Sequence, residues 1–429
     1  MIRNHQWLYG MFILISLASP LSAGAETLQQ AWDVALGANH SLKAAQESTV
    51  AAAKRLEAAK AARLPRVSLA AGYTALENSP AIRTSIGGPP IEFPIADRES
   101  LSYQAMATLP LYTNGQISSG IDAADAAFSA SRTQESGRTQ DLKLLVAESF
   151  VGVLRTTRGL DVANSRVVSL KAHTQDVENM YEQGMVSRND LLAAQVALAD
   201  AQQAEIKVKN ALDIAKSAYN RVLGRMLYQI VALDDLQPEL FAEPLEVLTE
   251  RALRQRHALI ALQDHVLALQ HQAAAIRAET GPQIALSGGY DFQENQYQVY
   301  EGQWLINLGL QWKIFDGGVT RHKAAATQQQ AMVLQEQYYE LVTQVALQVR
   351  QYWLDVQETH ERIPVTEKAI AQAEENLRVN RDRYENGLST NTEVLNATTL
   401  RTRTQNNHAN AIYDAVLATL RLKWSVSEL

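Results

Sequence analysis

The chain carries the same arrangement of residues twice, and this duplication constrains its fold more than any other feature. The segment "YEQGMVSRNDLLAAQV" at 181–196 is matched by "YENGLSTNTEVLNATT" at 384–399, 203 positions later (384 − 181). The segment "PRVSLAAGY" at 65–73 is matched by "PQIALSGGY" at 282–290, 217 positions later (282 − 65). The offset changes inside the proline- and glycine-rich stretch 77–100, which indicates a loop insertion there. We therefore expect a tandem repeat.

Each half contains two segments in which apolar and polar residues alternate, and these segments are predicted strands. They are residues 66–75, 101–111, 283–292 and 303–314. Each has about ten residues with tyrosine or tryptophan near its ends, which is typical of a tilted membrane strand with an interfacial aromatic girdle. The girdle residues are expected to be Tyr73, Tyr103, Tyr290, Trp304 and Trp312. A single hairpin of this kind also fits a soluble sheet with one buried face.

The remaining sequence is typical of long helices. No proline occurs between Tyr112 and Pro238, and apolar residues recur at helical spacing. A helix over 117–183 would be roughly 100 Å long, which is too long for an ordinary globular domain. The returning helix, from 187 to about 222, covers only part of that length, so a helix at 27–63 is expected to cover the rest. Pro364 in the second half is expected to kink its helix or change its packing.

Two glycine turns join the long helices to the returning ones. Gly184 and Gly387 stand where a helix must end, and glycine accepts the left-handed conformation that such an end requires. Each is followed by a capping-box pattern, Ser187-x-x-Asp190 and Thr390-x-x-Glu393, which starts a new helix. Both acids therefore have a structural role, which does not exclude a second one.

Composition excludes several classes of protein. The apolar run at 7–18, followed by small residues at 23–25, predicts a signal peptide over 1–25 and an exported chain. The absence of cysteine excludes disulfides, thiolate metal sites and lipidation of a cysteine. A formal net charge of −7 argues against a nucleic-acid partner. The histidines show no H-E-x-x-H spacing, so neither an enzyme nor a metal or other cofactor is expected.

Four membrane strands cannot close a barrel, whose minimum is about eight strands. An open sheet edge is not tolerated in lipid, so identical chains must complete the barrel in a ring. A dimer would give eight strands and a trimer twelve. A lumen filled with water requires small inward side chains. The inward residues with small side chains are Ser68, Ala70, Gly72, Gly289 and Gly309. The same ring would align the helical hairpins into a second tube.

Four short motifs connect this layout to a known family. They are "FDGG" at 315–318, "YxxG…DLLxAQ" at the first turn, "YxNG…EVLNA" at the second, and "YNRVLG" at 219–224. Over essentially its full mature length the chain resembles a TolC-type outer membrane factor. The resemblance implies a mainly helical homotrimer whose periplasmic α-barrel continues into a shared 12-stranded β-barrel. It further implies an exit duct in the outer membrane of a Gram-negative bacterium, serving a tripartite efflux pump or a type I secretion system.

The resemblance also implies partners and functional residues. The partners are a periplasmic adaptor protein, an inner membrane pump of the RND or ABC type, and outer membrane lipid. The residues that dock the adaptor would be Gly184, Met185, Val186, Ser187, Gly387, Leu388, Ser389 and Thr390. The gate would use Asp190, Tyr384, Glu393 and Asn396. Ser389 replaces an arginine of some relatives and Asn396 an aspartate, which implies a less tightly closed and less cation-selective gate.

The expected organisation is a signal peptide (1–25), a first repeat (26–224), a linker (225–250) and a second repeat (251–429).

Two alternative functions also fit parts of the sequence: a trimeric outer membrane adhesin and a structural coiled-coil envelope protein. In an adhesin the four strands would be contiguous at the C-terminus, whereas here helices separate the two hairpins. The signal peptide and the aromatic strand ends argue against a coiled-coil protein.

Overall fold

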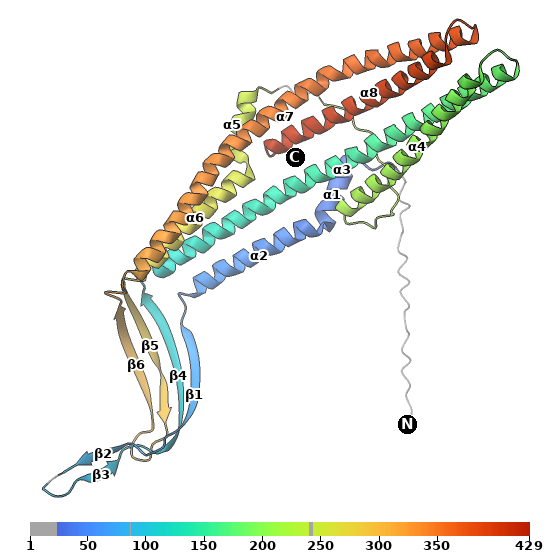
Figure 1. The fold of residues 1–429 in the computed structure, drawn as a ribbon. Helices are drawn as coiled ribbons and strands as arrows, with labels where there is room; N and C mark the ends of the chain where they lie inside the picture. The colour runs from blue at the N-terminus through green and yellow to red at the C-terminus, as the bar shows by residue number, and fades with distance from the viewer. Residues whose placement is uncertain (1–23, 86, 240–242) are drawn as a thin grey trace, which may run out of the picture.

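The computed structural model describes residues 24–85, 87–239 and 243–429. The predicted signal peptide lies almost entirely outside these residues. The described chain forms two long helical hairpins that lead into a narrow sheet (Figure 1). The helices are α1 (Leu28–Ala38), α2 (His40–Ala61), α3 (Gln116–Glu182), α4 (Arg188–Val222), α5 (Leu245–Gln255), α6 (His257–Ala278), α7 (Val319–Glu385) and α8 (Asn391–Ser425). The strands are β1 (Arg66–Ala75), β2 (Ala81–Thr84), β3 (Ile91–Pro94), β4 (Glu99–Tyr112), β5 (Pro282–Gln293) and β6 (Gly302–Trp312).

The helices repeat in length and in spacing. Helices α3 and α7 both have 67 residues, and α4 and α8 both have 35. The first residues of α3 and α7 lie 203 positions apart (319 − 116), and those of α2 and α6 lie 217 apart (257 − 40). These are the two offsets found in the sequence. The change of offset falls at the small hairpin β2–β3, which follows β1 and has no counterpart between β5 and β6.

The single helix expected over 27–63 is two helices, and that prediction was wrong. Asn39 interrupts it in an extended conformation (φ −68°, ψ 121°). Its side chain accepts hydrogen bonds from the backbone of Ser41 and Leu42 and thereby caps α2. Its amide group donates to the carbonyl of Val222 at 2.9 Å. The break therefore bends the chain to pack against the end of α4.

Apolar positions of the long helices form the core between the hairpins. Phe150 is fully buried, and its ring meets that of Tyr219 edge-on at 6.0 Å. Val146 and Val349, which correspond at the offset of 203, are both fully buried. The predicted correspondence of these faces is confirmed at this pair. Pro364 lies inside α7 and does not end it, so the helix continues to Glu385.

The main sheet is antiparallel, with strand order β1-β4-β5-β6 (Figure 1). The register pairs Tyr73 with Leu101, Tyr103 with Phe292, and Tyr290 with Trp304. Because side chains alternate between faces, these pairs mark one mainly apolar face. The five residues predicted to point inward all lie on the opposite face, whose side chains are mainly small or polar. They are Ser68, Ala70, Gly72, Gly289 and Gly309. Within residues 24–85, 87–239 and 243–429, no strand pairs with the outer edge of β1 or of β6.

None of the helices in the described parts of the chain is both long and apolar enough to cross a membrane.

Candidate functional site at the helical tips

The two helical hairpins end in turns of the same construction, close together at the end of the molecule opposite the sheet (Figure 1). Gly184 has φ +75° and Gly387 has φ +70°, as expected for residues that end a helix in the left-handed conformation. Both predicted capping boxes are formed. Ser187 caps α4 together with Asp190, and Thr390 caps α8 together with Glu393. The structural role of the two acids is therefore confirmed.

Both turns expose apolar side chains at their outermost point. Met185 is 63% exposed and Leu388 is 68% exposed. Val186, by contrast, packs against a buried apolar cluster that joins the two hairpins. A groove of about 470 Å³ lies between the turns and takes its lining from both of them. Its lining includes Met180, Met185, Asp190, Tyr384, Gly387 and Asn391.

The residues expected at the gate are brought to the same end of the molecule but differ in burial. Tyr384 is buried, and its hydroxyl has no hydrogen-bond partner among the residues that the structure describes. Burial, with a smaller contribution from the charge of Asp190, raises the pKa of Tyr384 above its usual value. Glu393 and Asn396 are exposed. Their action as a gate stays a prediction.

Ser389 bonds within its own turn. Its hydroxyl donates to the carboxylate of Glu393, which lowers the pKa of that acid, and the backbone N–H of Thr390 lowers it further. Glu393 is therefore a carboxylate at neutral pH. Ser389 therefore holds the capping acid of α8 within its own turn.

Two residues at this site were missed from the sequence. His173 on α3 and Asn391 on α8 are 5% and 2% exposed, and His173 Nε2 lies 2.7 Å from Asn391 Oδ1. The Asn391 amide group donates to the carbonyl oxygen of Asp190 at 2.8 Å. The only signal in the sequence was an asparagine directly after the N-cap Thr390, where the first turn has Arg188.

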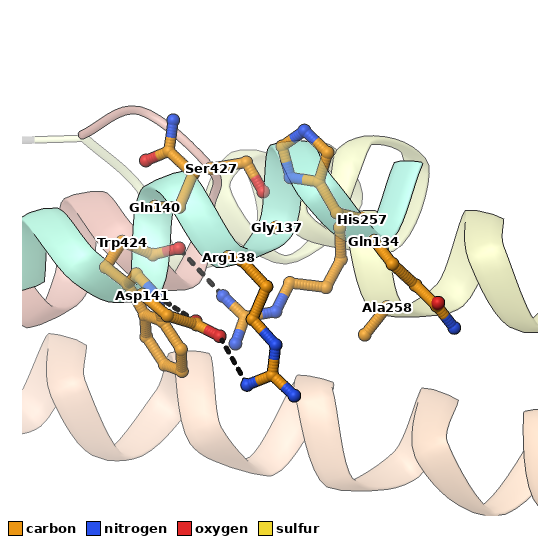
Figure 2. A pocket seen from close by; sticks show the side chains of 10 residues that line it. Gln134, Gly137, Arg138, Gln140, Asp141, His257, Ala258, Trp424 and Ser427 are labelled. Carbon is orange, nitrogen blue, oxygen red and sulfur yellow. Dashed lines mark hydrogen bonds and ion pairs between the residues drawn. The ribbon is translucent and has the colours of Figure 1, made fainter. Parts of the chain in front are cut away.

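A second pocket lies where α3, α6 and the end of α8 meet (Figure 2). There Trp424 Nε1 donates to Asp141 at 3.0 Å, and the guanidinium of Arg256 lies 3.7 Å from the centre of the Trp424 ring. Arg256 also donates to the carbonyl of Trp424. These contacts hold the end of α8 in place, so the pocket is a structural junction. In the described residues no group of three or more His, Asp or Glu side chains could hold a metal ion.

Comparison with known proteins identifies the family. The model of the outer membrane efflux protein family matches residues 31–225 and 248–426, which together cover most of the chain. The chain belongs to the outer membrane efflux protein family. As a member, this outer membrane efflux protein is an exit duct of the Gram-negative outer membrane with a large periplasmic portion. The family consists of channel proteins rather than enzymes.

Three known proteins show how far the similarity extends. The outer membrane protein TolC of Vibrio cholerae is 22% identical, over 98% of this chain and 95% of that protein. The alkaline protease secretion protein AprF of Pseudomonas aeruginosa is 26% identical, over 99% of this chain and 88% of that protein. The structure of the Campylobacter jejuni outer membrane channel CmeC superposes with a TM-score of 0.80 at 14% identity, covering 94% of this chain and 85% of that one. The superposition shows that this efflux protein and CmeC have the same fold.

Proposed function

We propose that three copies of this chain join edge to edge into one duct, in which each copy contributes four strands to a 12-stranded barrel. The observation that supports this most directly is the sheet. One face carries large apolar side chains that are almost fully exposed in the single chain, such as Trp304 (81%) and Ile306 (85%). Both edges are unpaired in the single chain, and lipid does not tolerate either an open edge or a lone four-stranded sheet.

The two faces of the sheet then meet different surroundings. The apolar face would contact outer membrane lipid. Tyr103 stacks on Tyr290, and Tyr290 meets Trp304 edge-on, towards the end of the sheet far from the helices. Trp312 lies at the end near α7. This placement fits two aromatic girdles, one at each membrane surface. The small and polar face would line a lumen filled with water.

The helical tips would form the periplasmic entrance. Apolar side chains exposed on both turns fit a docking surface for a periplasmic adaptor, which would connect the duct to an inner membrane pump of the RND or ABC type. Carboxylates of Asp190 and Glu393 from three copies would favour cations at this entrance. We also propose that the segments 26–224 and 251–429 are the two repeats, joined by 225–250, although α5 already begins at Leu245.

Acidic substitutions at the two outermost apolar residues test adaptor docking. We expect Met185→Asp combined with Leu388→Asp to abolish export of toxic compounds while the protein stays assembled in the outer membrane. Both side chains are exposed, so the substitutions should change the stability of the fold little. A carboxylate in the apolar centre of an interface, by contrast, weakens binding by about 2 kcal/mol or more. Growth inhibition by a panel of compounds, measured in a deletion strain complemented with each variant, gives the readout.

The matched control for docking is Ile230→Asp. Ile230 is 91% exposed and lies in the segment between the repeats, away from the turns. This variant is expected to export as the wild type does. Full export by the Met185/Leu388 variant, or equal losses in both variants, would contradict docking at the turns.

A further inference from the structure

The two halves of one chain meet along a continuous junction. In the sheet, β4 of the first half pairs with β5 of the second half. Among the helices, α3 packs along α2 and α4 of its own half and along α6 and α8 of the other half (Figure 1). Helix α7, which corresponds to α3, packs mainly along α6 and α8 of its own half. In the described part of a single chain, α7 and β6 therefore each keep a side that corresponds to a covered side of α3 or β4.

Exposure along α7 agrees with a missing neighbour. Ala130 and Val151 on α3 are fully buried. Their counterparts on α7 lie 203 positions later (333 − 130 and 354 − 151). These counterparts, Val333 and Leu354, are 57% and 45% exposed. Because removing apolar surface from water stabilises an interface, a partner that covers these side chains would stabilise the assembly.

The two main strand hairpins share one register, which allows positions to be compared residue by residue. Gly72 pairs with Ser102 in the first hairpin, and Gly289 pairs with Leu305 in the second. The first members of these pairs lie 217 positions apart (289 − 72), and the second members lie 203 apart (305 − 102). These are the two offsets of the repeat. Strand β1 therefore corresponds to β5, and β4 corresponds to β6, without a slip.

The junction between β4 and β5 then defines a register for the outer edges of β6 and β1. At this junction Met106 lies opposite Gly289. Adding 203 to the first number gives Gly309 on β6, and subtracting 217 from the second gives Gly72 on β1. The same transfer applies to every other pair of the junction. It predicts which residues would meet if β6 of one copy reached β1 of another.

The transferred register keeps the two faces of the sheet apart. It places Asn307 opposite Thr74, and Leu308 opposite Tyr73. Asn307 and Thr74 both lie on the small and polar face, whereas Leu308 and Tyr73 both lie on the apolar face. A shift by one residue would bring apolar side chains onto the polar face. The edges of β6 and β1 therefore match each other in pattern.

Glycine occupies corresponding positions on β5 and β1. A Cβ atom at Gly289 would overlap the carbonyl oxygen of Ala105 and lie 2.9 Å from Met106 Cα, so the close approach of β4 requires glycine there. A Cβ atom at Gly72 would meet one atom of the described residues within 4 Å, Ser102 Oγ at 3.3 Å. The single chain thus leaves room beside Gly72, and a strand from another copy can use that room.

We propose that β6 of one copy pairs antiparallel with β1 of the next copy, in the register that joins β4 and β5 within a chain, so that Gly309 lies opposite Gly72. This contact between copies is called the seam. The inference rests on the proposed function, because the barrel of three copies supplies the next copy, and it adds which residues meet. Gly72 is then a positioning residue that lets the neighbouring strand approach. Helix α7 continues the seam, with Val333 and Leu354 against α2 or α4 of the next copy.

Disulfide bridges at two depths of the seam test the register. The chain has no cysteine, and β1 and β6 are the outer strands of the sheet, about 14 Å apart at about 4.8 Å per strand, so a bridge between them must join two copies. Under a mild oxidant in the outer membrane, Asn307→Cys with Thr74→Cys should give covalent dimers and trimers on a denaturing gel. Gln311→Cys with Ala70→Cys should do the same. The swapped combinations, Asn307 with Ala70 and Gln311 with Thr74, place the thiols four residues out of register and should stay monomeric.

The bridging result is separated from the proposed function by the unmodified protein. Its assembled band is measured first, in unheated samples. If that band is absent, the proposed function fails. If the band is present and the swapped combinations bridge as well as the matched ones, or no combination bridges, the register is wrong while the duct stands.

Valine at position 72 tests the role of the glycine. We expect Gly72→Val to reduce the assembled trimer about tenfold, because its side chain occupies the path of the neighbouring strand. Ala70→Val, on the same strand and the same face, is the matched control and should assemble as the wild type does. Adding Ser102→Ala to Gly72→Val removes the close neighbour within the chain and should not restore assembly. Restored assembly, or an equal loss for Ala70→Val, would overturn the role of Gly72 at the seam.

Discussion

Arginine in place of Leu308 is expected to remove this protein from the outer membrane, whereas arginine in place of the neighbouring Asn307 is expected to leave it there. The two residues are adjacent on β6 and point to opposite faces of the sheet. Leu308 is 67% exposed on the apolar face. An arginine on the lipid face near the bilayer midplane destabilises a barrel by about 2–4 kcal/mol, and the proposed trimer would carry this penalty three times. On the face that is proposed to line the lumen, the same charge would meet water.

Membrane fractionation and gel migration of unheated samples measure this difference. For Leu308→Arg the assembled band in the outer membrane fraction should fall strongly, with monomer or degraded protein in its place. For Asn307→Arg the band should persist. Loss of the Asn307 variant together with a normal Leu308 variant would mean that the two faces of the sheet are assigned the wrong way round.

The long helices and the main strands could be predicted because each of them has a counterpart in the other half of the chain, at a constant offset in the sequence. The two 67-residue helices and the two capping boxes all follow from local patterns that recur at a constant offset. The break at Asn39 could not be predicted in the same way. At the corresponding position the second repeat has Arg256, which makes no side-chain cap, so the two halves do not share a cap signal.

The tip contact escaped prediction for a different reason. His173 and Asn391 are 218 positions apart, and neither belongs to a motif. Pattern analysis along one helix places a histidine on a face but does not say which helix packs there. The buried contact arises only when α3 meets the start of α8, and that meeting depends on how the two hairpins pack. The sequence therefore predicts the two turns, whereas the contact between them is visible only in the structure.

An acidic residue near the start of the described chain provides the second prediction. Glu26 Oε1 pairs with Arg225 Nη2 at 2.5 Å, and both side chains are mostly buried. The hydroxyl of Tyr219 donates to Glu26 at 3.0 Å, and burial of that hydroxyl raises the pKa of Tyr219, so it stays protonated. The backbone N–H of Glu26 also donates to the carbonyl of Ala232. The pair thus ties the chain start, the end of α4 and the segment between the repeats into one junction.

Glu26→Gln is expected to lower the free energy of unfolding by about 3–5 kcal/mol, because it leaves the Arg225 charge buried without a counter-charge. The matched control is Glu250→Gln, which breaks the exposed pair with Arg254 and should change the free energy by less than about 1 kcal/mol. Denaturant unfolding of the purified protein at one fixed concentration measures both values. Equal shifts would show that water reaches Arg225, and the junction would then owe its stability to Phe150 and Tyr219 packing beside it. A large shift for Glu26→Gln alone would show that an ion pair anchors the segment between the repeats to the helical hairpins.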